Sequence, residues 1–278
     1  MTLDLIGLGH PGVVRYHDGH DVAPTLSPRP YLTAAIGGGL ALTDVSPADH
    51  LHHLGISLAL PDVNGTSFWG GRTYRRGDGS ILLDNHGTQR VRERELADGH
   101  LVEHLDWRTR EGALLLVERR TIAVAEREVG WDLVWQSELT PAARDVSFGS
   151  PQTNGRDGAF YGGIFWRAPF GGAEVRTADG VGVEIAHGSH SPWLELTAGE
   201  VVLVAATSTG MPWFVRAEGY VGFCPAIAVD QRRVLPAGQS LHLDLAVAVR
   251  GVRRTGTDAV EGPDIIAERL LSSLRERV

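Results

Sequence analysis

The sequence contains no lysine, so all 26 of its basic residues are arginine. This absence excludes a Schiff-base lysine, a pyridoxal-phosphate anchor and the lysine of a phosphate-binding loop. A G-x-G-x-x-G pattern between a strand and a helix is missing too, because Gly37-Gly38-Gly39 has the wrong spacing and indicates a turn. We therefore do not expect a self-contained dinucleotide-binding domain.

Cysteine is almost absent, since Cys224 is the only one. A disulfide framework and a multi-cysteine metal site are excluded, and no base near Cys224 in the sequence supports a nucleophilic thiol. Residues 1–14 lack the features of a signal peptide, and no apolar run is long enough to cross a membrane. These absences predict a cytoplasmic protein.

Clusters of basic residues are also lacking, and the formal net charge is -8. Nucleic acid is therefore not an expected partner. No segment of the 278 residues is typical of a linker, so we predict one domain over residues 1–278.

What the sequence does have is segments in which hydrophobic residues recur at every second position. Turns that contain glycine separate these segments. The alternation is clearest at 241–249, where every second residue is leucine or valine. These patterns predict an all-β fold, an antiparallel two-sheet sandwich. The predicted strands are 101–107, 114–125, 131–139, 193–196, 201–206 and 241–249.

Helical periodicity is confined to the end of the chain. Pro263 opens a segment that carries Ile265, Ile266, Leu270 and Leu274 near helical spacing. We predict a C-terminal helix over 263–278 that packs on the sheets.

Histidines concentrate next to a carboxylate in Asp49-His50-Leu51-His52-His53, just before an apolar strand. Imidazole transfers protons near neutral pH and is a common metal ligand, so we select His50, His53 and His86 as catalytic candidates. In an extended segment, His50 and His52 would share one face and His53 would oppose them. Two alternatives remain open: a divalent metal on His50, His52 and His86, or histidines that only bond loop backbone.

Charge interrupts an apolar run at Glu118-Arg119-Arg120. Glu118 and Arg120 share the strand face of Leu116 and Ile122, where an unpaired charge is costly. Either the two lie on a solvated face and form an internal ion pair, or they project into a cavity, with Glu118 as a catalytic carboxylate and Arg120 as a substrate ligand.

Amide, guanidinium and aromatic groups beside glycine-rich segments indicate ligand binding, because glycine lets a ligand approach the backbone. Sugars stack on aromatic rings and bind polar groups through their hydroxyls. The binding candidates are Asn64, Trp69, Asn154, Arg156, Tyr161, Arg167 and Trp213, in addition to Arg120.

Several blocks together resemble the PmoA-like family of bacterial proteins, in particular its actinobacterial branch. They are 29–32, 49–55, 62–65, 68–70, 153–156, 161–169, 187–188, 192–193 and 212–216. In this resemblance His50 takes the place of the first signature histidine and His52-His53 that of the following pair. Leu51 and Leu54 stand where proline and arginine are frequent, so an anion-binding role of that arginine is not carried over.

The resemblance implies a role in sugar catabolism beside NAD-dependent sugar oxidoreductases, and an architecture similar to the galactose-mutarotase supersandwich. It does not imply oxygenase activity, because the membrane subunit that gives the family its name has spans that are missing here. We expect an enzyme that acts on a sugar or keto glycoside by acid–base chemistry, of the epimerase, lyase or hydrolase type. The alternatives are a non-catalytic carbohydrate-binding or accessory protein, with an oxidoreductase or a second copy as partner, and a histidine-ligated metalloprotein.

Overall fold

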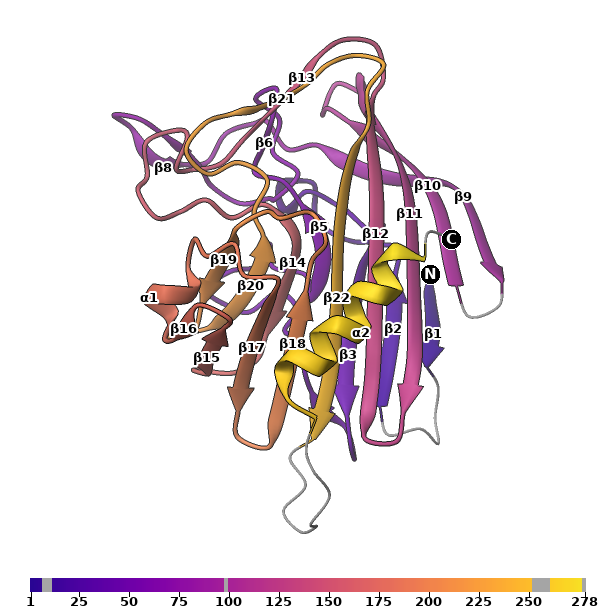
Figure 1. Cartoon of the computed structure of the whole chain (residues 1–278). Coiled ribbons are helices and arrows are strands. Elements are labelled where there is room, and N and C mark those ends of the chain that lie inside the picture. Colours follow the sequence, from indigo (N-terminus) through magenta and orange to yellow (C-terminus); the bar gives the residue numbers. More distant parts are fainter. Residues whose placement is uncertain (7–11, 98–99, 252–260, 277–278) are drawn as a thin grey trace.

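Two large antiparallel sheets face each other in the computed structural model (Figure 1). It describes residues 1–6, 12–97, 100–251 and 261–276. The first sheet has the strand order β1 (Thr2–Ile6), β2 (Gly12–His17), β3 (Tyr31–Ile36), β5 (Ile56–Ala59), β14 (Gly163–Ala168), β20 (Val221–Pro225) and β19 (Trp213–Arg216), with β4 (Leu40–Ala41) beside β3.

The second sheet holds all six strands that the period of two predicts. Its order is β16 (Gly180–Val181), β15 (Glu174–Thr177), β17 (Trp193–Ala198), β18 (Val201–Ala206), β22 (Leu241–Gly251), β12 (Gly130–Pro141), β11 (Leu114–Arg127), β10 (His100–Arg108) and β9 (Thr88–Ala97). The all-β prediction of an antiparallel two-sheet sandwich is confirmed, and each of the six predicted strands is present.

The main core lies between the two sheets, because each sheet turns one set of alternating side chains toward the other. On β22, Leu243, Leu245 and Val247 join this core, while Ala246 and Ala248 face the opposite side. The alternation that predicts the strand therefore also decides which of its residues meet the first sheet.

The predicted C-terminal helix is α2 (Pro263–Arg275), and residues 277 and 278 lie outside the described part. Proline at its start is favourable, since its missing N–H has no partner in the first turn. Ile266, Leu270 and Leu274 pack on Val204 and Ala246 of the second sheet, on the face turned away from the core (Figure 1). In the described residues no helix combines the length and the apolarity needed to cross a membrane.

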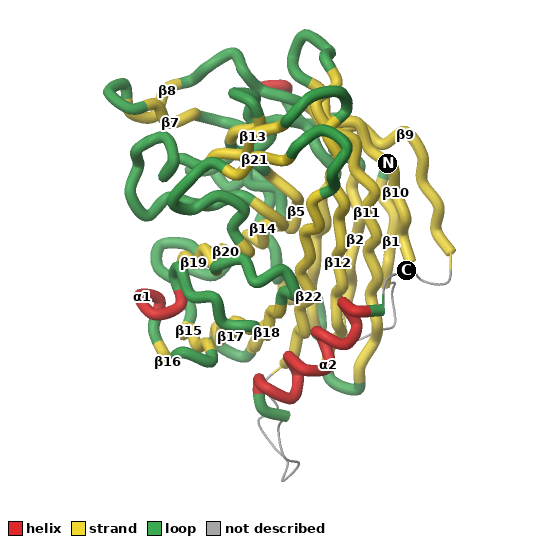
Figure 2. Tube along the Cα trace, turned by 45° about the horizontal axis from the view of Figure 1, so that its top comes forward, coloured by secondary structure: helices red, strands yellow, loops and turns green. Residues whose placement is uncertain are grey.

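Shorter elements and long loops gather at one end of the two sheets (Figure 2). They include the small sheet of β21 (Arg233–Leu235), β13 (Val146–Gly149) and β6 (Asp62–Val63), and the hairpin of β7 (Thr73–Arg75) and β8 (Gly79–Ile81). A 3-10 turn at Pro24–Leu26 and a short helix α1 (Val183–Ala186) complete the described elements.

Candidate functional site

The face of the first sheet that points away from the core carries the candidate site; we call it the outer face. Along β14, Ile164 and Trp166 enter the core between the sheets, whereas Phe165 and Arg167 project from the outer face. A second apolar cluster covers this face. It contains Ala59, Trp69, Phe160, Phe165, Phe214, Cys224 and Ala226, with Tyr161 and Tyr220 packed against it.

The histidine segment lies on this face as a turn, so the arrangement considered for an extended segment, with His53 opposite His50 and His52, does not occur. The amide of His50 donates to the carbonyl of Pro47, and that of His53 donates to the carbonyl of His50. As a result all three rings come together, with centroids 4.7 Å apart for His50 and His53, 4.7 Å for His52 and His53, and 5.7 Å for His50 and His52.

His53 is the buried member of the group, with 3% of its surface exposed. Its ring lies 5.4 Å from that of Phe165 and 5.6 Å from that of Trp69, and its Nδ1 has no hydrogen-bond partner among the described residues. Burial, followed by the charges of nearby histidines and arginines, lowers its pKa. The same causes lower the pKa of His52 to about 3. Both rings are therefore neutral at neutral pH.

His50 stands at the open edge of the cluster, with 36% of its side chain exposed. Its Nδ1 lies 2.7 Å from Oδ2 of Asp49. A carboxylate only accepts, so Nδ1 donates and the lone pair of the neutral ring is left on Nε2. The hydrogen bond with His50 lowers the pKa of Asp49. This is the arrangement in which an imidazole can take a proton from a bound molecule.

His86 lies beneath the cluster and approaches it from another loop. Its Nε2 donates to the carbonyl of Gly71 at 2.7 Å, and Gly71 in turn lies against the ring of His52. A Cβ at Gly71 would be 2.6 Å from Nδ1 of His52, so only glycine fits there. His86 therefore fits the alternative in which a histidine only bonds loop backbone.

A bound metal was one open alternative for His50, His52 and His86. Across residues 1–6, 12–97, 100–251 and 261–276, no group of three or more His, Cys, Asp or Glu side chains has the arrangement of a metal site.

Aromatic rings form a wall beside the histidines. The rings of Trp69 and Tyr161 lie 4.5 Å apart, and Tyr161 also contacts Phe214 at 5.5 Å. Arg156 is exposed and bonds the Tyr161 phenol, whose pKa burial raises to about 12. The structure thus brings Trp69, Arg156 and Tyr161 to the histidine face. A crevice that Trp69, Tyr161 and Asn154 line has a volume of about 10 Å³, room for at most one water.

Arg167 reaches the histidines because β14 is bonded to both ends of the histidine turn. Its amide donates to the carbonyl of Gly55 and its carbonyl accepts from the amide of Asp44, each at 2.9 Å. Its guanidinium lies 4.0 Å from the centre of the Tyr220 ring. Tyr220 in turn contacts His50 at 5.5 Å and His53 at 5.8 Å.

Glu118 and Arg120 do not reach this face. They point into the core between the sheets, where Glu118 bonds Arg120, Trp107 and Ser137 at 2.6–2.9 Å. The expected ion pair is present, but the solvated face is wrong, because both side chains are buried in the core. Glu118 is therefore not placed to act with the histidines. The period of two identifies a shared buried face but not which of the two sheets the strand joins.

Three further binding candidates form hydrogen bonds within the protein. Trp213 is fully buried between the sheets and donates to the carbonyl of Ser191 at 2.8 Å. Asn154 donates to Asp62 at 3.2 Å. Asn64, with a φ of 50°, closes a turn on Ser147. Their polar groups are occupied by protein partners, so the geometry does not present them to a ligand.

Sequence reasoning did not identify Arg29 and Tyr220 as site residues. Arg29 is 2% exposed and binds the carbonyls of His52 and Trp69 at 2.8 and 3.1 Å. A buried arginine that bonds only backbone and a hydroxyl has no local motif. Tyr220 follows Gly219 in the turn between β19 and β20. Apart from its being aromatic, nothing in the sequence marks it as a site residue.

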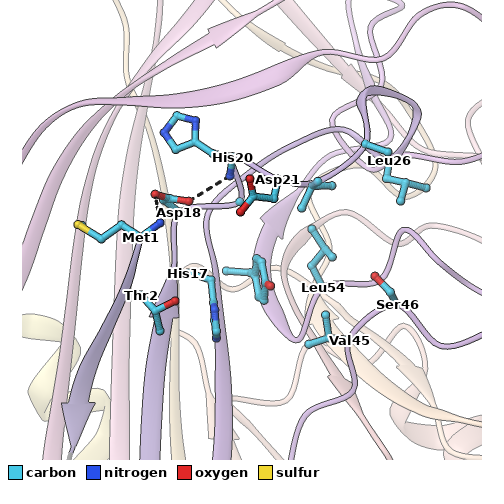
Figure 3. Close-up of a pocket in the computed structure, with 14 residues that line it drawn as sticks. Met1, Thr2, His17, Asp18, His20, Asp21, Leu26, Val45, Ser46 and Leu54 are labelled. Carbon is cyan, nitrogen blue, oxygen red and sulfur yellow. Dashed lines mark hydrogen bonds and ion pairs between the residues drawn. The ribbon is translucent and has the colours of Figure 1, made fainter.

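A separate hollow lies next to Val45, Ser46 and Leu54 (Figure 3). Its volume is about 410 Å³, and Met1, Asp18, His20 and Asp21 are among the residues that line it. Val45, Ser46 and Leu54, which flank the histidine segment in the sequence, form part of its wall. None of the predicted site residues lines it.

Because His52 and His53 are neutral in the folded protein, we expect the protein to lose stability in acid. Their pKa values lie below the unfolded value of 6.5, so the unfolded chain binds more protons and their contribution, complete above pH 6.5, is lost as the pH falls. We expect the free energy of unfolding to fall by about 2–4 kcal/mol between pH 7.5 and 4.5 from this cause.

Urea denaturation at several pH values tests this. His53→Gln should reduce the fall by about 1–2 kcal/mol. The control His242→Gln removes a histidine whose side chain is 56% exposed on the second sheet. Equal pH dependence of wild type and His53→Gln would contradict the prediction.

Comparison with known proteins places the chain in a family. The model of a family of unknown function, DUF6807, matches residues 6–260, and the chain belongs to this family. The resemblance to the PmoA-like family and to its actinobacterial branch is therefore wrong. The shared blocks are short segments, whereas the DUF6807 match runs through nearly the whole chain. No curated protein sequence matches.

Among solved structures, an Escherichia coli K12 protein named "Putative aldose 1-epimerase" is similar at a TM-score of 0.48 and 10% identity. The similarity covers 90% of this chain and 100% of that one.

Proposed function

We propose that this member of the DUF6807 family is an enzyme that acts on a sugar or a keto glycoside by acid–base chemistry, with the outer face as its active site. The observation that carries the proposal is the Asp49–His50 pair at the open edge, 2.7 Å from oxygen to nitrogen. Its free Nε2 would take a proton from a substrate carbon or hydroxyl, and Asp49 would stabilise the imidazolium that forms.

The aromatic wall supports a sugar as the substrate. Trp69, Tyr161 and Phe214 form one aromatic cluster in which Tyr161 is partly exposed, and sugars bind such rings through their C–H faces. His53 contributes a different property: it is neutral and buried against His50, so its ring adds no charge to the site.

The test is NMR titration of the purified protein with a panel of sugars, 3-keto glycosides among them, followed by turnover assays on the ligands that bind. We expect His50→Gln to lower kcat by about a hundredfold with little change in affinity, because only proton transfer is lost. His242→Gln is the control. Unchanged spectra across the whole panel, or a His50→Gln variant with the wild-type rate, would exclude this function.

A non-catalytic carbohydrate-binding protein, alone or as the accessory of a sugar oxidoreductase, is the second candidate. The aromatic wall favours it equally, since stacking needs no acid or base. Binding without turnover, unaffected by His50→Gln, would select it.

A further inference from the structure

The guanidinium of Arg167 is buried on the outer face with unused hydrogen-bonding capacity. The residue is 5% exposed, and its Nε and Nη1 have no hydrogen-bond partner in the described part of the chain. Its Nη2 lies 3.7 Å from Oδ2 of Asp44, beyond hydrogen-bond distance. A buried donor without a partner is costly, so this position favours a ligand that supplies acceptors.

The ring of Tyr220 covers this guanidinium. It lies 4.0 Å from the guanidinium carbon and within 6 Å of the rings of His50 and His53. The phenol therefore fills the space that Arg167 and the proton-transfer histidine enclose. Its backbone is in the turn between β19 and β20 and follows Gly219, whose φ is 74°. Rotation of the side chain away from Arg167 would vacate the volume of its own six-membered ring.

Positive charge concentrates around this space. Arg156, Arg167 and Arg216 all act on the phenol of Tyr220 and oppose the effect of burial, which raises its pKa. Arg156 and Arg216 act in the same way on Tyr161. Asp44, 3.7 Å from Arg167, and Asp49 beside His50 offset part of this charge. In a chain of net charge -8, the three guanidinium groups around the two phenols still form a local attraction for an anion.

We propose that the substrate of this face is a sugar acid, whose carboxylate displaces the ring of Tyr220 and binds Arg167. The inference rests on the proposed function and names its substrate class. Each forked edge of a guanidinium, Nε with Nη2 or Nη1 with Nη2, can bind a carboxylate through two hydrogen bonds, and each edge contains one of the unpartnered nitrogens. A planar carboxylate also fits a space between flat rings better than a tetrahedral phosphate does.

Calorimetric titration tests the proposal with D-glucuronate, D-galacturonate and D-gluconate against D-glucose, D-galactose and glucose 6-phosphate. The wild-type protein should bind at least one of the acids about tenfold or more tightly than its neutral counterpart, as expected for hydrogen bonds to a charged group. This comparison needs no variant. Absence of that preference, or tighter binding of the phosphate than of every acid, would overturn the proposal.

Variants identify the residues. Arg167→Met should remove the preference for the acid and leave the weaker affinity for the neutral sugar within about threefold. The matched control is Arg176→Met, which removes an exposed arginine on β15 that pairs with Glu195. Retention of the preference in Arg167→Met would overturn the proposal. Tyr220→Ala should bind the acid faster and at least as tightly, since no ring has to move; weaker binding would exclude displacement.

The outcomes for the two proposals are distinct. Binding of an acid through Arg167 without any turnover would exclude the enzyme and leave the ligand class standing. Turnover of neutral sugars that Arg167→Met does not affect would exclude the sugar acid and leave acid–base catalysis standing.

Discussion

Replacing Glu118 by alanine is expected to lower the free energy of unfolding by about 3–5 kcal/mol, because it leaves a buried guanidinium without its main partner. Arg120 is fully buried, and two of its nitrogens bond the Glu118 carboxylate at 2.8 and 2.9 Å. Arg120 also donates a hydrogen bond to Gln89 at 3.1 Å and lies 3.7 Å from the carboxylate of Glu103. These contacts are weaker than those with Glu118. Urea denaturation at pH 7.5 measures the loss.

The control for this prediction replaces both partners, as Glu118→Leu with Arg120→Met. Removing both charges leaves no unpaired ion in the core, so we expect the double variant to recover at least half of the lost stability. A catalytic role for Glu118 gives the opposite pattern, in which Glu118→Gln folds with wild-type stability but loses turnover. That result, or a loss below about 1 kcal/mol in Glu118→Ala, would contradict the structural role.

Glu118 also shows how far the period of two can predict this protein. Alternation along β11 correctly places Leu116, Glu118, Arg120 and Ile122 on one buried face. The pattern does not show, however, that β11 belongs to the second sheet, across the core from the outer face. Trp213 is a similar case, because Trp213 and Phe214 are both aromatic and only the sheet decides which of them faces inward.

The residues of the outer face depend on contacts between segments far apart in the sequence. The concentration of histidines singled out His50 and His53, but the spacing in the sequence did not show whether the segment is extended or a turn. Arg29 contacts the histidine turn 23 residues away and the Trp69 loop 40 residues away. Such contacts follow from the fold as a whole. The sequence therefore predicts which residues are candidates for the site better than it predicts their arrangement in space.

Loss of the Arg29 guanidinium is the second large effect that we expect. Arg29→Met should destabilise the protein by about 3–5 kcal/mol, since the side chain is buried and its partners would be left without a donor. It donates to the hydroxyl of Ser57 at 3.1 Å and to carbonyls of four residues at 2.8–3.1 Å. Those carbonyls belong to Leu26, Ser27, His52 and Trp69.

The effect on the site should exceed the effect on global stability. His52 and Trp69 lie on separate loops, and the Arg29 guanidinium bonds the backbone of both. We therefore expect hydrogen exchange in Arg29→Met to accelerate first in residues 46–54 and 66–71, before the strands of the second sheet. Arg29→Lys should fold less stably than wild type as well, because one ammonium cannot satisfy five acceptors arranged around a planar fork. Uniform acceleration over the whole chain would show that Arg29 stabilises the fold without specifically positioning the histidine turn and the Trp69 loop.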